Sequence, residues 1–433
     1  MGFALGSIWA TFFLISMGFF TKNRSTKSID NNFIAIDVGT HAVKALFVVN
    51  EGKRGRVVGV GKRLQKLGDM QSGTVTDIAS VISNCNDAIR DAERMAGMRA
   101  TQMVMGIGGE LVKGGTISSS YIRRDPTAKI DLAELKNIVH KIQWKAFDQV
   151  RGQLSYETGY SEIDVKLVNA AIVDVRIDGY KVTNPIGFQG KEITISIFNA
   201  FAPLVHYGAL QTIAAEIDKE LIAITAEPYA LSRAFDNDDG KFGAIFIDVG
   251  GGTTDVAVVR DGVLEGTKMF TLGGRTFTKR LAHSLNISFN EAESIKMAYS
   301  EDKLEKQSHK IVREAMKSDC DVWLSGVALT LSEFEHIDVF PSKILLSGGG
   351  SKLPEIREVL ESKSWLSNLP FAKKPQVSFV NTKYITDLTD ETRILNNLED
   401  TAPMALAHIG SEFIQDEQVL SKVLKKVVRL MQI

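Results

Sequence analysis

The chain contains two short stretches in which an apolar run ends in aspartate and then turns through glycine and threonine. The first reads Asp37-Val38-Gly39-Thr40-His41, and the second reads Asp248-Val249-Gly250-Gly251-Gly252-Thr253-Thr254-Asp255. Such a turn presents consecutive backbone N–H groups and a hydroxyl to a phosphate, and its aspartate can hold a hydrated Mg²⁺. Two facing loops of this kind would grip a polyphosphate, with Asp37 and Asp248 holding the metal through water.

A third glycine-rich turn follows the apolar residues 344–346 and reads Ser347-Gly348-Gly349-Gly350-Ser351. It leads into a predicted helix, and a turn at the start of a helix can lie against a nucleoside. No glycine-lysine pair in the chain is followed by serine or threonine, so the P-loop motif is absent from the sequence. The three turns therefore predict a nucleotide site that differs from that of P-loop enzymes.

The elements that must position these loops are strands. Each aspartate loop lies between an apolar strand and a return strand, and this repeat implies two similar domains. Between the repeats, residues 109–203 change in character and indicate a small inserted α+β module. Apolar periodicity places the other expected elements as strands at 103–107, 116–122, 163–175 and 192–199, and as helices at 77–95, 131–147 and 204–221.

Composition excludes several classes of protein. The 433 residues are 44% apolar, as in an ordinary globular chain, which excludes a disordered or collagen-like protein. Lysine and arginine number 51 against 52 acidic residues, so no overall positive field gathers nucleic acid, and none is expected as a partner. Cys85 and Cys320 are the only cysteines, which excludes a disulfide framework and an all-cysteine metal cluster.

The first 30 residues are unusually apolar. Residues 3–20 carry no charge, and Lys22, Arg24 and Lys27 follow directly. Eighteen residues just suffice to span a bilayer, and basic residues on this side would keep the bulk of the chain in the cytoplasm. The alternative is an over-extended N-terminus caused by a misjudged translation start, with Met17 as a candidate for a later one.

The C-terminal segment has the pattern of a basic amphipathic helix. Leu420, Val423, Leu424 and Val427 recur at helical spacing, and Lys422, Lys425, Lys426 and Arg429 fall largely on the remaining arc. Such a helix either lies in a membrane interface or packs on the protein's own core. Its position after the acidic, loop-like residues 411–418 favours the membrane.

Taken together, the three loops resemble those of the actin, sugar-kinase and DnaK-type ATPase superfamily. The resemblance implies an α/β fold, a duplicated ribonuclease-H-like two-lobed ATPase that binds ATP with Mg²⁺. In this superfamily the first two loops bind the phosphates from the two halves, and the third binds the adenosine. His41 departs from the pattern, because a small or hydroxylic residue is usual at its position.

The site residues that this resemblance implies fall into four groups. The phosphate loops are Asp37, Gly39, Thr40, His41 and Lys44, and Gly250, Gly251, Gly252, Thr253, Thr254 and Asp255. The adenosine loop is Gly348, Gly349, Gly350 and Ser351. Further nucleotide contacts are Gly273 and Gly274, and the Glu293–Lys296 pair, whose spacing also suits an exposed helical ion pair. The catalytic residues are Glu227 and Asp248, although Glu227-Pro228 alone would suit the first turn of a helix.

Segments outside these loops resemble the FtsA family of bacterial division proteins, which tie FtsZ filaments to the membrane. They are residues 73–81, 88–97, 103–109 and 184–190. This resemblance implies at most a slow ATPase that forms filaments, binds the FtsZ C-terminal tail and other division proteins, and attaches through its C-terminal helix. The location it implies is the cytoplasmic face of the inner membrane, at the division site.

The FtsA resemblance also implies a domain arrangement. Its parts are a hydrophobic N-terminal segment at 1–30, a first actin-like subdomain at 31–108 and 204–241, an inserted α+β domain at 109–203, a second lobe at 242–286 and 341–385, an inserted partner-binding subdomain at 287–340, a return to the first lobe at 386–412, and a linker with a membrane-targeting amphipathic helix at 413–433.

Within the partner-binding subdomain, basic residues recur along helical sequence and would suit an acidic peptide. They are Lys296, Lys303, Lys306, Lys310, Arg313 and Lys317. The alternative is a solvated basic face balanced by acidic neighbours. Lys62 and Arg63 are also expected on a solvated face.

Two other functions remain open on this fold. A PilM-like scaffold of type IV pilus assembly shares the inserted domain, and residues 226–234 resemble that branch too. A small-molecule kinase of the superfamily would need a substrate cleft with a catalytic aspartate. A DnaK-type chaperone is excluded, because only about 80 residues follow the third loop.

Overall fold

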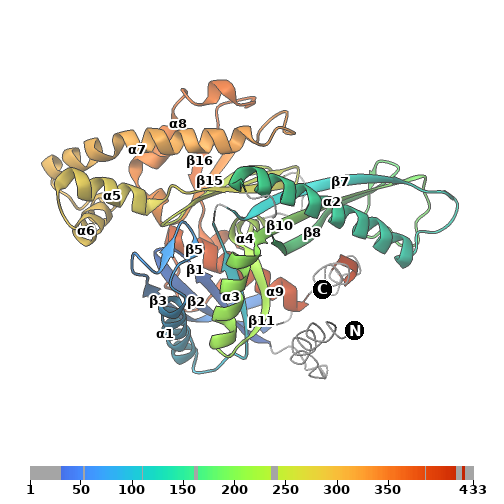
Figure 1. The fold of residues 1–433 in the computed structure, drawn as a ribbon, viewed down its shortest axis with the longest axis horizontal. Coiled ribbons are helices and arrows are strands. Elements are labelled where there is room, and N and C mark those ends of the chain that lie inside the picture. Colours follow the sequence, from blue (N-terminus) through green and yellow to red (C-terminus); the bar gives the residue numbers. More distant parts are fainter. Residues whose placement is uncertain are drawn as a thin grey trace, which may run out of the picture. The chain divides into compact units, whose positions relative to one another are not determined.

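The computed structural model describes residues 31–51, 54–109, 111–159, 164–235, 242–385, 387–415 and 422–424. The apolar run at 3–20 and most of the expected C-terminal helix lie outside the described residues. The described part is a mixed α/β fold built on two large sheets, each carrying one aspartate loop at a strand end (Figure 1). We call the part around the six-stranded sheet lobe I and the part around residues 244–379 of the nine-stranded sheet lobe II.

The strands of the six-stranded sheet are, in spatial order, β11 (Glu220–Ala226), β6 (Gln102–Ile107), β1 (Asn32–Val38), β2 (Ala42–Glu51), β3 (Arg54–Leu64) and β17 (Leu388–Asp390). Those of the nine-stranded sheet are β16 (Gln376–Phe379), β15 (Lys343–Ser347), β12 (Ala244–Val249), β13 (Thr254–Arg260), β14 (Val263–Phe270), β7 (Lys113–Ile122), β10 (Glu192–Pro203), β8 (Val165–Ile177) and β9 (Tyr180–Lys181). A separate small ladder pairs β4 (Met70–Gln71) with β5 (Thr74–Val75).

Five strands of each lobe repeat one arrangement. The order β11-β6-β1-β2-β3 in lobe I matches β16-β15-β12-β13-β14 in lobe II. In both, the first two pairings are parallel and the last two are antiparallel. The duplicated two-lobed fold that the repeated loops predict is therefore confirmed.

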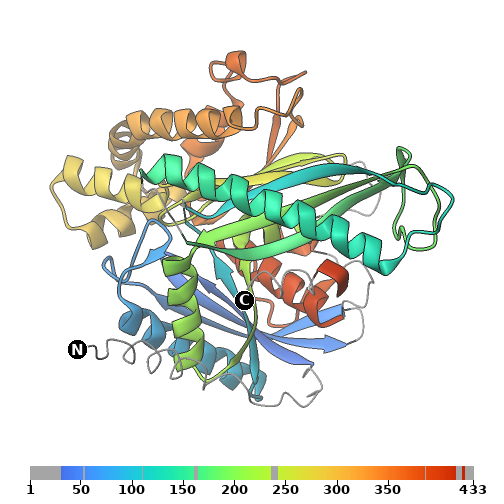
Figure 2. The ribbon, with the colours of Figure 1, turned by 45° about the vertical axis from the view of Figure 1, so that its right-hand side comes forward.

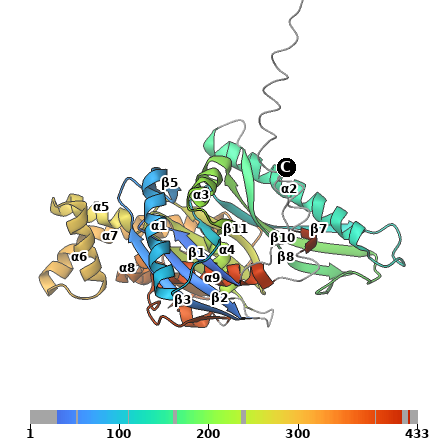
Figure 3. The same ribbon diagram turned by 90° about the horizontal axis from the view of Figure 1, so that it is seen from below.

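The helices that cover these sheets are α1 (Ile78–Ala96), α2 (Leu132–Thr158), α3 (Leu204–Glu216), α4 (Glu227–Ala234), α5 (Gly274–Leu285), α6 (Phe289–Ser300), α7 (Lys306–Ser332), α8 (Pro354–Glu361) and α9 (Thr401–Gln415). Short 3-10 turns are η1 (Gly349–Lys352), η2 (Leu366–Asn368), η3 (Thr382–Tyr384) and η4 (Leu398–Asp400). In lobe I, α1 packs on β2 and β3 beside α3, as Figure 3 shows. In lobe II, α7 packs against α5, α8 and β14.

The core runs through both lobes because β12 is buried on both of its faces. Ala244 and Phe246 belong to the apolar cluster shared with lobe I, whereas Ile245 and Ile247 belong to the cluster beneath α5 and α7. A continuous apolar strand is what burial on both faces requires. The end of β12, where the second aspartate loop begins, is thereby held between two packed layers.

The inserted module joins lobe II in a way that the sequence does not predict. Its chain leaves β6 and returns to α3, both in lobe I, but β7 pairs with β14 of lobe II at Gly266↔Gly115 and Thr267↔Gly114. A Cβ on Gly114 would lie 2.1 Å from the Thr267 Oγ1 atom, so glycine permits this close approach. Helix α2 lies along the module's strands (Figure 2).

Two predicted helices differ in length from the structure. The helix expected at 204–221 ends at Glu216, because Asp218 takes a left-handed backbone conformation (φ 56°) and β11 begins at Glu220. Helix α2 continues about three turns beyond the expected end and stops at Gly159, which is also left-handed (φ 73°).

Three residues of the expected C-terminal helix, 422–424, are described and are helical. Val423 (3% exposed) and Leu424 (4%) lie in the apolar cluster formed by α2 and the strands of the inserted module, and Lys422 is exposed. Val423 and Leu424 therefore pack on the protein's own core, which is the alternative to a membrane interface given for this segment. Among the helices of the described ranges, none combines the length and apolar character needed to span a bilayer.

The contact between α1 and β3 depends on two glycines. A Cβ on Gly61 would lie 1.9 Å from the Ala88 carbonyl oxygen, and one on Gly59 would lie 2.1 Å from that of Ala92. We predict that Gly61→Ala lowers the free energy of unfolding by about 1–3 kcal/mol, since the helix backbone must move away. Urea unfolding measures this. Gly68→Ala is the control, because no heavy atom lies within 4 Å of its Cβ position; equal losses in both variants would contradict the close packing.

Candidate functional site

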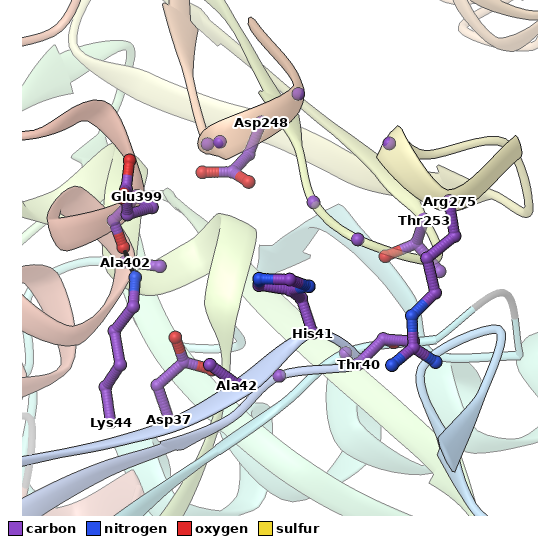
Figure 4. Close-up of a pocket in the computed structure, with 18 of the residues that line it drawn as sticks. Asp37, Thr40, His41, Ala42, Lys44, Asp248, Thr253, Arg275, Glu399 and Ala402 are labelled. Atoms are coloured by element: carbon purple, nitrogen blue, oxygen red, sulfur yellow. Dashed lines mark hydrogen bonds between the residues drawn. The ribbon is translucent and has the colours of Figure 1, made fainter. Parts of the chain in front are cut away.

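One cavity between the lobes brings the three glycine loops together (Figure 4). The predicted site residues that line it are Asp37, Gly39, Thr40, His41, Lys44, Glu227, Asp248, Gly250, Gly251, Thr253, Asp255, Gly274, Glu293, Lys296, Gly348, Gly349 and Gly350. Residues far apart in the sequence thus meet at strand ends of both sheets. The arrangement predicted from the loops, with one aspartate loop on each side, is the arrangement observed.

Register explains how the duplicated hairpins differ. In lobe I, Asp37 of β1 pairs with Lys44 of β2, and in lobe II, Asp248 of β12 pairs with Asp255 of β13. Lys44 therefore occupies in lobe I the position that Asp255 occupies in lobe II. Its ammonium donates to the backbone oxygen of Glu399.

The third loop lies directly against the second. Gly348 has a left-handed backbone (φ 81°), and a Cβ there would lie 2.4 Å from the Val249 carbonyl oxygen and 2.5 Å from Asp248 Oδ1. Ser347 Oγ donates a hydrogen bond of 2.6 Å to Asp248 Oδ2. Only glycine fits at 348, and Ser347, to which the sequence motif assigns no role, holds the second aspartate in place.

On the lobe II side, Lys296 is buried rather than exposed. Its Nζ donates to Glu293 (2.8 Å), to the Gly274 oxygen (3.0 Å) and to Thr278 Oγ1 (2.7 Å). The interpretation of Glu293 and Lys296 as an exposed ion pair is therefore wrong. Lys296 is also wrongly placed among the basic residues of a partner surface, because its charge faces the cavity.

Four predicted residues do not line the cavity but shape its loops. Thr254 Oγ1 donates to the Leu272 oxygen and accepts from Trp323, inside lobe II. Ser351 Oγ donates to the backbone oxygen of Ser347. The other two residues are glycines in close contacts. A Cβ on Gly252 would lie 2.8 Å from Thr40 Oγ1, and one on Gly273 would lie 2.7 Å from the Gly250 oxygen.

The sequence-based analysis missed several lining residues. They include Lys62, Arg275, Met297, Ser300, Lys352, Glu399 and Ala402. Lys62 is exposed, as expected for a solvated face, and its Nζ also lies 3.9 Å from Glu399. Arg275 follows the glycine pair directly, which is the only signal for it; Glu399 lies in a stretch that carries no motif.

Arg275 joins the lobes. It is the second residue of α5 in lobe II, and its buried guanidinium donates to the backbone oxygens of Gln65 and Met70 in lobe I, each at 3.3 Å. Its backbone N–H donates to the Gly251 oxygen at 2.8 Å. One residue thus links the second glycine loop to the opposite lobe.

Of the acidic residues that line this cavity, four have raised pKa values: Asp37, Glu227, Asp248 and Asp255. Burial raises the pKa of Asp37 to about 6, with Lys44 opposing the rise. Burial, followed by neighbouring carboxylates, raises the pKa values of Glu227 and Asp255 well above their usual range. The pKa of Asp248 is also raised by burial, and the Ser347 hydroxyl limits this rise.

The acidic groups fit a hydrated Mg²⁺. Within the described residues, buried oxygens Asp37 Oδ1 and Asp255 Oδ1 accept no hydrogen bond. Across the same ranges, no three acidic, histidine or cysteine side chains converge closely enough to bind a metal directly. Carboxylate oxygens that accept no hydrogen bond, and that are too few to coordinate a metal by themselves, suit Mg²⁺, which keeps several of its waters and also binds phosphate oxygens.

Comparison with known proteins agrees with this geometry. The sequence profile of the family "Cell division protein FtsA" matches residues 245–394. The FtsA of Neisseria meningitidis serogroup B is 27% identical over 267 residues, which is 61% of this chain and 60% of that protein. The FtsA of Pseudomonas aeruginosa is 23% identical, covering 92% of this chain and 97% of that one.

The chain is FtsA-like. The match to the Neisseria protein spans three-fifths of that relative's length. A solved structure titled "PilM-PilN type IV pilus biogenesis complex" superposes with a TM-score of 0.63 at 17% identity, covering 88% of this chain and 98% of that one. At this identity the likeness shows the fold alone, which for this FtsA-like chain is the two-lobed actin-like one.

Burial of Asp37 makes the stability of the FtsA-like chain depend on pH. Between about pH 4 and pH 6 the folded state keeps a proton that the unfolded state has released, so the free energy of unfolding falls as pH rises. We predict that Asp37→Asn raises this free energy at about pH 7.5 by up to about 3 kcal/mol, with no gain near pH 4.

Thermal unfolding at several pH values measures the effect in the nucleotide-free protein. Asp338→Asn is the matched control, because Asp338 is exposed on the loop after α7. A gain of the same size at every pH, or in both variants, would contradict burial of the Asp37 charge as the cause.

Proposed function

We propose that this chain binds ATP with Mg²⁺ between its lobes, forms filaments, and anchors FtsZ filaments to the cytoplasmic face of the membrane during cell division. The observation that carries the proposal is the convergence of the two aspartate loops and the third glycine loop on one cavity. The similarity to FtsA proteins supports the division role.

The chain's own groups suit each part of the nucleotide. Backbone N–H groups of the loops after Asp37 and Asp248 face the phosphates, and the third loop, with Gly348, faces the nucleoside. Bound Mg²⁺ would neutralise phosphate charge and orient the transferred group. Glu227 would position or activate water, and burial raises its pKa well above the usual range.

Nucleotide binding is testable through Asp248. We predict that Asp248→Ala lowers the Mg²⁺-dependent affinity for ATP at least about tenfold, because one metal-holding carboxylate and its contact with the third loop are lost. Calorimetric titration with and without Mg²⁺ measures this. Asp338→Ala serves as the control; an Asp248→Ala protein that folds and binds MgATP normally would refute the proposed site.

A candidate surface for an acidic peptide lies on α7. Lys306, Lys310 and Lys317 are exposed, and Ile311 between them is 49% exposed. Arg313, in contrast, pairs with Glu358. We therefore place the FtsZ tail on the lysine-bearing part of α7, where an acidic and partly apolar peptide finds both charge and apolar contact.

Membrane attachment is assigned to the C-terminal helix. Its basic residues suit anionic lipid, and each adds about 1 kcal/mol near such a surface. Val423 and Leu424 lie against the inserted module, so this helix must leave the module before these side chains enter lipid. Binding to the membrane and packing on the module therefore exclude each other.

Recruitment of FtsZ to vesicles tests the division role directly. We predict that purified FtsZ floats with anionic vesicles only when this chain and MgATP are present. The variant Lys310→Glu/Lys317→Glu should float by itself but recruit several-fold less FtsZ, since the acidic tail is repelled. Lys373→Glu/Lys374→Glu, at exposed positions before β16, is the control.

The same experiment separates the second candidate, a PilM-like scaffold. The fold likeness to the PilM–PilN complex favours such an architecture. A chain that binds nucleotide and vesicles but leaves FtsZ in solution would reject the FtsZ role and favour the scaffold.

A further inference from the structure

His41 occupies an unusual place between the two phosphate loops. It lies in the turn between β1 and β2, and Figure 4 shows its imidazole in the middle of the cavity. A Cβ on Gly251 of the second loop would lie 2.9 Å from His41 Cβ and 3.1 Å from its backbone nitrogen. The backbone and Cβ of His41, in lobe I, therefore lie against the glycine loop of lobe II, and the imidazole extends into the cavity between them.

The surroundings of His41 leave its ring without a fixed partner. Across the described ranges, the ring makes no hydrogen bond. The charged groups that act on it are Glu293 and Lys296 of α6, Arg275 of α5 and Lys62 of β3. Burial lowers the pKa of His41, Glu293 opposes this, and the three cations lower it further. Without a ligand the imidazole is neutral at neutral pH.

We propose that His41 is a positioning residue that takes up a proton when the nucleotide phosphates bind and then donates a hydrogen bond to them, which makes nucleotide affinity depend on pH. The inference rests on the proposed nucleotide function of this cavity. Several negative charges placed beside an imidazole favour its charged form, and charge-assisted hydrogen bonds to phosphate are strong. A threonine or serine at this position would bind phosphate without any proton uptake.

The sign of the effect follows from linkage. If the complex holds a proton that the free protein lacks, affinity rises as pH falls between about pH 8 and pH 6. The buried carboxyl groups Asp37, Glu227, Asp248 and Asp255 act in the opposite direction, because Mg²⁺ displaces their protons. The contribution of His41 is therefore measured as the difference in pH-dependent affinity between the wild type and a His41 variant, because both proteins keep these carboxyl groups.

The experiment is calorimetric titration with MgATP at several pH values, in pairs of buffers that differ in ionisation enthalpy. The proteins are the full chain, His41→Gln, which keeps a hydrogen-bond donor but does not titrate, and His283→Gln at an exposed position near the end of α5. Protonation of ATP itself is common to all three and cancels in the comparison.

We expect the wild-type affinity to rise up to about tenfold more than that of His41→Gln between pH 8 and pH 6, with up to one additional proton taken up. His283→Gln should behave as wild type, and adenosine should show no difference between the proteins. Equal pH dependence in wild type and His41→Gln, with both binding MgATP, overturns this proposal alone. If the wild type and His41→Gln differ in the pH dependence of adenosine binding as well, the contact between His41 and phosphate is refuted. If the wild type binds no nucleotide, the proposed nucleotide function of the cavity is refuted.

Discussion

The central constraint on this structure is the free-energy cost of placing Asp37, Glu227, Asp248 and Asp255 together between the two lobes. Lys44 is the cation that lowers the pKa values of three of them, Asp37, Glu227 and Asp248. Burying a charge without a partner costs free energy. Burial therefore favours the neutral forms of Asp37, Glu227 and Asp255 and raises their pKa values. A site of this kind is stable when protonated or when a cation enters. In the proposed function, a metal–polyphosphate complex would offset the cost of burying these carboxyl groups.

The duplication explains how such a site arises from a simple repeat. Two equivalent hairpins bring their aspartates to opposite sides of the cavity, and the strand register determines which residue pairs with each of them. Lys44 in one lobe and Asp255 in the other make the two halves electrostatically unlike. Arg275 then ties the halves together through backbone oxygens of lobe I, so that loops from separate sheets keep a fixed spacing.

Much of this could be predicted from sequence, because the aspartate loops depend on short-range features. A strand, an aspartate and a glycine turn lie within about ten residues of one another, and their repetition fixes the duplicated fold. What could not be predicted depends on tertiary contact. Glu399 reaches the cavity through the 3-10 turn before α9, and β7 joins the sheet of lobe II at two residue pairs. Neither of these leaves a periodic or local pattern.

The C-terminal helix illustrates how a structure limits an inference from amphipathicity. Val423 and Leu424 are already removed from water by the inserted module, so moving them into lipid exchanges one apolar environment for another. Their hydrophobic contribution largely cancels in that exchange. In the proposed attachment to the membrane, the driving force would then come from the other apolar residues of the segment and from its lysines, whose attraction to anionic lipid weakens as salt screens it. The proposed membrane binding would therefore depend on lipid charge and on how strongly the inserted module retains Val423 and Leu424.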